Sequence, residues 1–423
     1  MRDARQPSAG WSLYRALGWV VLAGLAASSA ATAGDDSHRP KLTFNGYATL
    51  GLVHSSEDRA DFLGSFLLER GAGFTADWSA EVDSRVGAQL TATFGPQLSA
   101  VVQLVAEQQA DGEYTPHLEW ANLKYQVSPD FSLRLGRVVL PSFMVSDFRK
   151  VGYANAWVRP PVEVYALIPI SSSDGLDASY RVSFGDYADT LQGNVGRSET
   201  DLPDGGTARA RSLWGLTNLL ERGPASFRLA YQQADLSIDS YNTLFDAFRQ
   251  FGPPGEAIAE RFDSDGAVFQ FLGAGALYDP GKWFATAEWG SIRTHSAVGD
   301  RTAWFASGGY RLGEVTLYLT HSQVRPDSET SDPGLSLVGL PPELAGIAAG
   351  LNAALNGLLG GNPDQSTLSL GARWDFRENL DLKIQYDRNR LGRGSAGNLG
   401  NVQPSFRPGG RYELISVAVD VVF

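Results

Sequence analysis

The charged side chains most able to do chemistry gather in one segment, residues 141–174. The segment combines acids with bases in the set Asp147, Arg149, Lys150, Arg159 and Glu163. Its prolines and aromatic residues favour a loop that keeps one shape. Fixed charges of both signs on such a loop create an electric field that sorts ions by charge. The alternative is a solvated surface loop that a few aromatic residues anchor.

No pattern in the sequence indicates bond-making catalysis. There is no Cys, and the HExxH and Walker A motifs are absent. Residues 275–282 have glycines like a phosphate-binding loop, but with the wrong spacing. The five His residues lie outside any recognisable nucleophile or metal motif, at His38, His54, His117, His295 and His321. We therefore predict no catalytic residue, no metal site and no cofactor.

The elements that must position the charged segment are predicted to be strands. Polar and apolar residues alternate one by one over many stretches, for example 82–94, 176–184 and 368–376. This period of two residues produces a strand with one polar and one apolar face. Sixteen such strands are predicted, at residues 41–56, 80–95, 97–109, 116–128, 130–140, 175–185, 187–199, 208–221, 224–239, 265–279, 283–296, 301–312, 315–327, 365–377, 380–391 and 411–423.

The connections between these strands alternate between two classes. Seven are tight turns, and the other eight include the long segments 57–79, 141–174, 240–264, 328–364 and 392–410. Short turns at one end and long loops at the other are typical of bacterial outer-membrane barrels. An even strand number brings both chain ends to the short-turn side. The predicted fold class is all-β, a transmembrane antiparallel β-barrel of about sixteen strands.

Aromatic residues mark both edges of the apolar face. One set lies near the short turns, at Phe44, Phe94, Phe131, Phe184, Phe227, Trp283, Phe376 and Phe423, and a second lies near the other end, at Trp289, Trp304 and Tyr386. Two aromatic belts are expected where a barrel contacts outer-membrane lipid. The chain also ends on Phe423 after an alternating strand. This ending is similar to the signal that outer-membrane proteins present to the barrel assembly machinery.

Residues 1–33 are predicted to be a signal peptide. Arg2, Arg5 and Arg15 precede the apolar run 16–27, and residues 31–33 form a small-residue cleavage site. The run is shorter than the roughly 20 residues that a membrane-spanning helix needs. Residues 34–423 then form the exported barrel domain. The net charge of −12 argues against nucleic acid as a partner, because phosphate binding needs a basic face.

Three stretches carry a resemblance to a known family. They are LEWANLKY at 118–125, LRLGR at 133–137 and WVRPPVEVY at 157–165. Together with the predicted barrel, they resemble the sixteen-stranded, trimeric general porins of Gram-negative outer membranes. The resemblance implies an outer-membrane location, a homotrimer, and a third loop (141–174) that folds into the barrel and constricts it. It also implies that acids of this loop face bases of the barrel wall.

Carried over by position, Asp147 and Glu163 are the loop acids. The wall bases on the inward face are Arg85, Arg134 and Arg181, with Lys124, Arg373 and Lys383 as further inward bases. The loop departs from the family pattern because it also carries Arg149, Lys150 and Arg159, so no ion preference is predicted. Arg137 falls on the outward parity, and its role stays open. Small outward residues favour close approach of two walls, although lipid fits them equally well; they are Gly46, Ala48, Ala88, Ala92, Ala100 and Ala106.

Strand number links this fold to a function. Sixteen strands spaced about 4.8 Å apart and tilted roughly 40° make a backbone cylinder about 32 Å across, which leaves an aqueous bore. The predicted function is passive diffusion of small hydrophilic solutes and ions. The first alternative is a substrate-specific channel for anions or sugars. An adhesin, which predicts a filled lumen, and a barrel-embedded enzyme are the other classes.

Two long loops contain helical patterns. Leu344, Ile347, Leu351, Leu355 and Leu358 are spaced like one face of a helix, and so are Leu244, Phe248 and Phe251. Loops 240–264 and 328–364 are therefore predicted to hold helices. Each is a lid, a latch between subunits, or a small helix packed on neighbouring loops.

Overall fold

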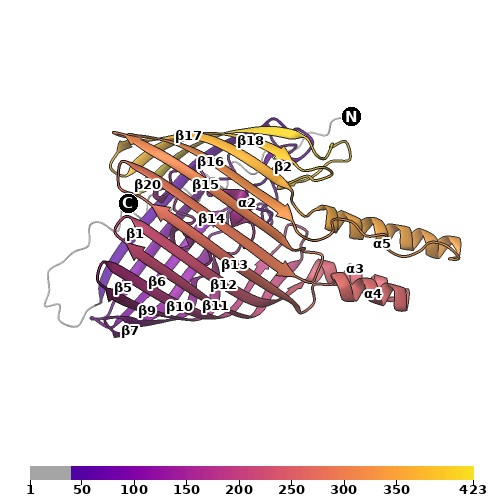
Figure 1. Ribbon diagram of the computed structural model, residues 1–423, viewed down its shortest axis with the longest axis horizontal. Coiled ribbons are helices and arrows are strands. Elements are labelled where there is room, and N and C mark those ends of the chain that lie inside the picture. The colour runs from indigo at the N-terminus through magenta and orange to yellow at the C-terminus, as the bar shows by residue number, and fades with distance from the viewer. Residues whose placement is uncertain (1–39) are drawn as a thin grey trace.

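The computed structural model describes residues 40–423, which form a closed antiparallel β-barrel (Figure 1). The predicted signal peptide lies outside the described residues. Sixteen long strands pair in chain order, and β1 also pairs with β20, which closes the ring. They are β1 (Lys41–Ser55), β5 (Arg85–Thr93), β6 (Leu98–Glu107), β7 (His117–Ser128), β8 (Phe131–Val139), β9 (Ser172–Phe184), β10 (Tyr187–Asp201), β11 (Thr207–Arg222), β12 (Ala225–Ile238), β13 (Ala267–Tyr278), β14 (Trp283–Thr294), β15 (Arg301–Leu312), β16 (Val315–Pro326), β17 (Gln365–Arg377), β18 (Leu380–Leu391) and β20 (Arg411–Val422).

The predicted barrel of sixteen strands is confirmed. Predicted strands 301–312, 365–377 and 380–391 match β15, β17 and β18 at both ends. The largest difference is at β5, which begins at Arg85 rather than residue 80. The residues before it form a turn, and a two-residue strand, β4 (Trp78–Ser79), pairs with β1 there.

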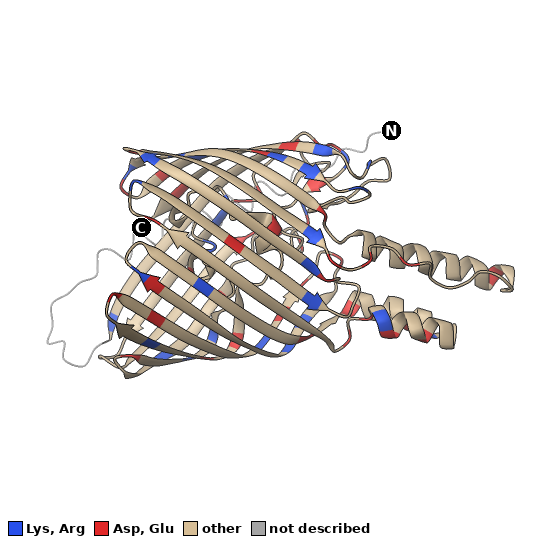
Figure 2. Cartoon of the chain, viewed as in Figure 1, with Lys and Arg blue, Asp and Glu red and all other residues tan. Residues whose placement is uncertain are grey.

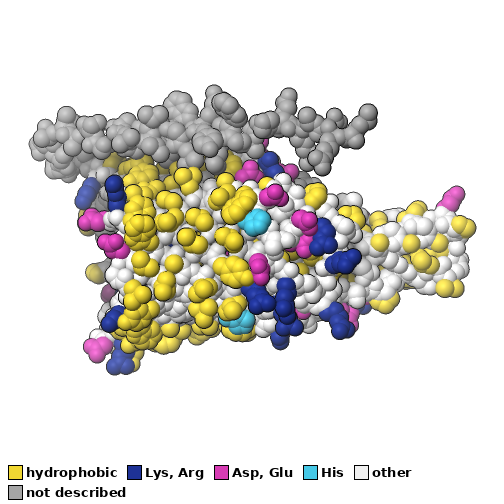
Figure 3. Space-filling view, turned by 90° about the horizontal axis from the view of Figure 1, so that it is seen from above, with side chains coloured by type: hydrophobic (Ala, Val, Ile, Leu, Met, Phe, Trp, Pro, Cys, Tyr) yellow, Lys and Arg dark blue, Asp and Glu magenta, His cyan; other side chains and the backbone are white. Residues whose placement is uncertain are grey.

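The two faces of the wall follow the alternation. On β15, Trp304 and Tyr310 are 36% and 42% exposed, whereas Phe305 between them in sequence is 1% exposed and points inward. Figure 3 shows apolar side chains over the outer face away from the helices, and charged side chains gathered between that zone and the helices. Acidic and basic side chains are interspersed over the barrel rather than separated by sign (Figure 2).

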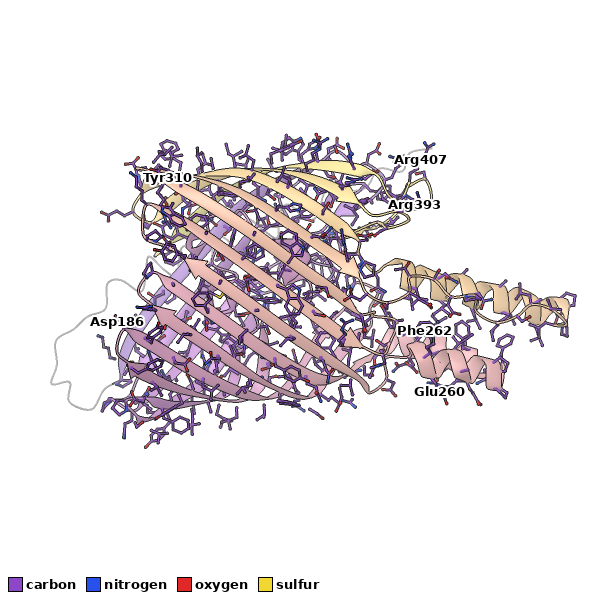
Figure 4. All side chains as sticks on the ribbon, viewed as in Figure 1. Asp186, Glu260, Phe262, Tyr310, Arg393 and Arg407 are labelled. Atoms are coloured by element: carbon purple, nitrogen blue, oxygen red, sulfur yellow. The ribbon has the colours of Figure 1, made fainter. Side chains whose placement is uncertain are left out.

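Tight turns connect successive strands at one end of the barrel. Gly185 and Gly313 stand in two of these turns with φ of 58° and 64°, a left-handed conformation in which other residues are strained. In Figure 4, Asp186 marks this end, and Phe262, Arg393 and Arg407 mark the other, where the long loops gather. Three two-residue strands, β2 (Asp61–Phe62), β3 (Ala72–Gly73) and β19 (Leu399–Gly400), form a small sheet between the first and last of these loops.

Both predicted helical loops contain helices, which project beyond the long-loop end (Figure 1). They are α3 (Asp239–Arg249), α4 (Pro253–Phe262) and α5 (Pro342–Gly360). Phe245 and Phe248 of α3 and Leu355 of α5 are fully buried in one cluster that joins the helices. Leu344 and Ile347 are 44% and 55% exposed, whereas Ala348 is buried, so α5 is packed from Ala348 onward and not over its first turns. Among residues 40–423, no helix has the length and apolar character needed to cross a membrane.

Candidate functional site

The connection between β8 and β9 folds into the barrel. This segment, the inner loop (residues 140–171), contains the short turns η1 (Ser146–Phe148) and η2 (Gly152–Ala154) and the helix α2 (Val162–Tyr165). Figure 1 shows α2 within the outline of the barrel. The inner loop is shorter than the predicted 141–174 because β9 begins at Ser172.

Aromatic side chains of the inner loop pack on the inner wall. The ring of Phe143 lies edge-on to Phe271 of β13 at a centroid distance of 5.4 Å, and Trp157 meets Phe305 of β15 in the same way at 5.6 Å. All four side chains are buried in one cluster. The apolar face of the loop therefore rests on the wall made by β11 to β16.

Glycines in that wall make room for the loop. A Cβ atom on Gly290 would lie 2.8 Å from the Leu167 side chain, and one on Gly275 would lie 2.6 Å from Met144. Neither distance leaves space for a side chain, so these positions form the seat of the loop. The sequence contains both glycines, but nothing in their pattern distinguishes them from glycines in other strands.

Polar contacts fix the loop against the same wall. Trp157 Nε1 lies 3.0 Å from both Ser307 Oγ and Thr320 Oγ1. The carboxylate of Glu288 on β14 accepts hydrogen bonds from the Met144 amide at 2.8 Å and the Tyr165 hydroxyl at 2.5 Å. These contacts satisfy buried polar groups that would otherwise destabilise the fold.

The predicted loop acid Glu163 faces neutral groups. Its carboxylate accepts hydrogen bonds from Ser322 Oγ and Gln365 Nε2, each at 2.7 Å, and from the Thr367 hydroxyl. Asp147 is more than half exposed, and its carboxylate lies 3.9 Å from Arg228, which is not one of the three carried-over wall bases. The two loop acids therefore do not pair with Arg85, Arg134 or Arg181.

The loop base Lys150 meets two carboxylates of the wall. Its Nζ lies 2.5 Å from Glu107 of β6 and 2.7 Å from Glu119 of β7. His117 is close to the same group, with 3.5 Å between its Nε2 and the Glu119 carboxylate. Burial disfavours the ammonium, but attraction to Glu107 and Glu119 outweighs burial and raises the pKa of Lys150.

Arg159 forms the second contact between a loop base and wall acids. Its Nε and Nη2 lie 2.8 and 2.6 Å from the two carboxylate oxygens of Asp83, and Nη1 lies 3.5 Å from Asp387 of β18. Burial opposes the charge of Arg159, yet attraction to Asp83 prevails and raises the pKa of this arginine.

Arg149 is held without an acid. It donates to the backbone carbonyls of Tyr165 and Ile168 at 2.8 and 2.9 Å, and its guanidinium lies over the Phe143 and Tyr165 rings. Burial lowers the pKa of Arg149. These contacts give it a role in holding the fold of the loop.

The predicted wall bases divide into two groups. Arg373 donates to the carbonyls of Tyr153 and Asn155 at 2.5 and 2.9 Å, and Lys383 donates to the Gly152 carbonyl at 2.6 Å, so these two hold the loop. The remaining four do not contact the loop acids. Arg85 lies 3.7 Å from Glu107, Arg134 lies 2.8 Å from Asp177, Arg181 pairs with Glu221 at 3.0 Å near the short turns, and Lys124 stands opposite Arg134 in the sheet.

The charge arrangement of the site thus differs from the one that the resemblance implied. Two loop bases, Lys150 and Arg159, face wall acids, whereas of the two predicted loop acids only Asp147 lies near a wall base, Arg228. Alternation already places Asp83, Glu107 and Asp387 on the inward face. Glu119 has no such signal, because the β6–β7 register shifts beside it, between Gln103 and Leu104.

Arg137, whose role stayed open, pairs with an acid of the neighbouring strand. It stands opposite Ala121 on β7 and makes a two-point ion pair with Asp174 of β9 at 2.7 and 2.8 Å. Gly136 beside it has φ of 124°, and a Cβ there would lie 2.2 Å from the Ala121 carbonyl. The pair links β8 to β9, and Arg137 also lines a polar cavity beside the inner loop.

A polar cavity of about 870 Å³ lies beside the inner loop. Its lining on the β5–β7 side includes Arg85, Glu107, His117 and Glu119, and the loop adds Arg149, Lys150 and Arg159. A closed barrel with a charged cavity of this volume inside it matches a channel rather than a packed core.

Comparison with known protein families decides the identity of this architecture. The family model described as Gram-negative porin matches residues 18–421. The chain belongs to the Gram-negative porin family. As a member, this porin is an outer-membrane channel for passive diffusion. Comparison with curated protein sequences found no match.

Solved structures share the fold at low sequence identity. This porin is similar to the anion-selective porin from Comamonas acidovorans, with TM-score 0.52, 12% identity and coverage of 91% of this chain and 100% of that one. It is also similar to Salmonella typhi OmpF in complex with daunomycin, with TM-score 0.53, 13% identity and coverage of 91% of this chain and 98% of that one. A third similar structure is the outer membrane channel DcaP of Acinetobacter baumannii, with TM-score 0.53, 11% identity and coverage of 93% of this chain and 100% of that one. At this identity the likeness concerns the fold alone.

Proposed function

We propose that the inner loop is the constriction of this diffusion channel. The observation that carries the proposal is that the loop is tied to opposite parts of the wall. Lys150 reaches β6 and β7, whereas Trp157 reaches β15 and β16. A segment held at both places crosses the lumen, and the polar cavity beside Lys150 is the passage that remains.

We further propose that the constriction selects weakly between cations and anions. Lys150 and Arg159 each face two carboxylates, and Arg85 beside Glu107 and the loop base Arg149 bring this group to four bases and four acids. A matched charge produces a weaker field along the passage than a ring of one sign. Small hydrophilic solutes and ions are the expected permeants.

The chain acts as a channel without enzymatic activity in this proposal. Several of its buried carboxylates bind groups of the inner loop, as Glu288 does with Met144 and Tyr165. Within residues 40–423, no group of three or more His, Asp or Glu side chains is placed to hold a metal ion. The interior thus supports a structural role for these residues.

We infer four further properties for the whole protein. Residues 1–33 direct export, and Phe423 is recognised by the assembly machinery. The barrel contacts outer-membrane lipid through its apolar face and forms a homotrimer. Small outward residues on the neighbouring strands β1, β5 and β6, such as Ala88 and Ala92, support close approach between subunits.

Single-channel recording tests the proposed function. The chain lacking residues 1–33 is refolded and inserted in a planar bilayer, and conductance and reversal potential in a salt gradient are measured. We expect ohmic steps in groups of three and a reversal potential close to zero. We also expect the channel to exclude polymers that would be small enough to enter a sixteen-stranded barrel without an inner loop. A folded barrel without conductance overturns the channel, and admission of such polymers overturns the constriction.

A further inference from the structure

Arg301 is an inward-facing arginine without an acidic partner. It begins β15, is half-buried, and its Nε has no hydrogen-bond partner within the described chain. Tyr241 of α3 is the titratable group beyond its own strand that interacts with its charge. Arg311, on the same face of the same strand, pairs with Asp279 at 2.6 and 2.7 Å. Arg301 thus differs from an otherwise matched arginine by its free guanidinium.

The space in front of Arg301 is mainly apolar. A cavity of about 420 Å³ extends from the inner loop toward the helices, and Arg301 and Tyr241 line it together with apolar groups that include Leu236, Phe269 and Val324. The cross-strand neighbours of Arg301 are Ile292 and Pro326, so the sheet supplies no counter-charge. A volume in this range suits a small organic molecule.

The other charged groups of this cavity are already engaged. Glu163 accepts three hydrogen bonds from wall residues, and Arg209 pairs with Asp239 at 2.5 Å. Arg301 is therefore the cationic group left to attract an anion. Burial raises the pKa of Tyr241, so its hydroxyl stays protonated and able to donate a second hydrogen bond.

We propose that this cavity is a transient binding site for small amphipathic carboxylates, with the carboxylate on Arg301 and the apolar body against Leu236, Phe269 and Val324. A guanidinium suits a carboxylate because it donates two parallel hydrogen bonds. The apolar wall adds affinity by removing the hydrocarbon part of the solute from water. Acetate lacks the hydrocarbon part, and a neutral aromatic alcohol lacks the charge.

The site lies on the route through the channel. The apolar and polar cavities share lining residues, among them Val162, Ala166 and Ser198, so the two cavities adjoin. Passage requires binding that is favourable enough for entry and weak enough for release. The inference rests on the proposed channel function and names a solute class that it favours.

The experiment records current through the wild-type channel in a planar bilayer while sodium benzoate is added. We expect transient interruptions whose frequency rises with benzoate concentration. Sodium acetate and benzyl alcohol, at equal concentration, are expected to interrupt the current at least tenfold less often. Open-channel conductance without added solute is the internal reference for channel formation.

Three variants and a matched control locate the site. Arg301→Gln is expected to weaken apparent benzoate affinity about tenfold or more, and Leu236→Ser several-fold, while Arg311→Gln changes it less than twofold. Arg301→Lys keeps the charge and should retain part of the affinity. This variant also separates loss of charge from loss of fold.

The outcomes distinguish the two proposals. Wild-type channels that conduct but respond alike to benzoate, acetate and benzyl alcohol overturn the carboxylate site and leave the diffusion channel intact. Equal effects of Arg301→Gln and Arg311→Gln overturn the assignment to Arg301. Absence of any conductance from the folded wild type overturns the channel itself.

Discussion

Arg159 of the inner loop and Asp83 before β5 form a two-point ion pair, with Nε–Oδ1 and Nη2–Oδ2 distances of 2.8 and 2.6 Å. Their side chains are only 9% and 3% exposed. Arg159 also lies over the Phe62 ring at 5.0 Å and donates to Ser416 Oγ at 2.8 Å. The loop, the first long loop and the last strand therefore meet at one guanidinium.

Replacing Arg159 tests this junction. Arg159→Gln leaves Asp83 buried without its counter-charge, and we expect a loss of about 3–5 kcal/mol in the free energy of unfolding. Urea titration on refolded barrels measures the change, and current noise reports release of the loop. Arg393→Gln, in an exposed loop, is the control (Figure 4).

A double variant gives the sharper result for the same pair. If the two side chains interact directly, Arg159→Gln combined with Asp83→Asn destabilises less than the sum of the single changes. Additive effects would show that Asp83 is held by other groups, and the junction as described would be wrong.

Lys150 is expected to set the ion preference of the passage. Lys150→Gln removes the cation that Glu107 and Glu119 share and leaves Arg85, 3.7 Å from Glu107, to offset two carboxylates, so the channel becomes more cation-selective. Reversal potential in a tenfold KCl gradient should move toward the potassium equilibrium potential. Lys282→Gln, exposed in the turn between β13 and β14, should leave it unchanged. A shift toward anions would exclude Lys150 from the passage.

The barrel was predictable from the sequence because strand alternation is a local property. β15 needed only the apolar and polar order of residues 301–312, and α5 needed only the spacing of its leucines. The seat of the inner loop depends on distant residues. Gly290 meets Leu167, and Lys150 meets Glu119 across a register shift, and neither contact has a local signature. The place of the loop between two strands is therefore readable from the sequence, whereas its contact partners are visible only in the structure.

Alkaline pH should deprotonate Lys150 and remove its ion pairs with Glu107 and Glu119. Its pKa is raised above the ordinary 10.5, so its contribution to stability is complete below that value and disappears as pH rises through the folded pKa. The wild type should lose more stability than Lys150→Arg between about pH 10.5 and 12, because arginine stays charged. Urea midpoints over this range measure the difference, and parallel curves would contradict it.

Gly152 is a contact point between the inner loop and the last strand. A Cβ there would lie 2.0 Å from the Asp420 carboxylate and 2.6 Å from Thr49 Oγ1, and the Gly152 carbonyl accepts from Lys383. Gly152→Ala should displace η2, destabilise the barrel by about 1–3 kcal/mol and increase current noise. Gly193→Ala, where the nearest atom is 3.9 Å away, is the matched control. Equal behaviour of the two variants would remove Gly152 from the docking site.

Phe423 and Gly46 join the last and first strands of the barrel. Gly46 N donates to the Phe423 carbonyl at 2.7 Å, and Phe423 N donates to the Gly46 carbonyl at 2.9 Å. The Phe423 ring covers Gly46 so closely that a Cβ there would lie 2.3 Å from Cζ. The terminal phenylalanine thus packs on the first strand as well as ending the chain.

Overpacking at this seam should slow or prevent closure. Gly46→Val is expected to lower the fraction of folded barrel after refolding in detergent, because the Phe423 ring must move and strain the pairing of β1 with β20. Ala48→Val, two residues along the same outward face, should have little effect. Heat-modifiable migration on gels measures the folded fraction, in the absence of the assembly machinery. Phe423→Ala removes the clash and should restore folding of Gly46→Val in the double variant. If that double variant folds no better than Gly46→Val, the defect arises from the strand itself, and the ring has no part in closing the seam.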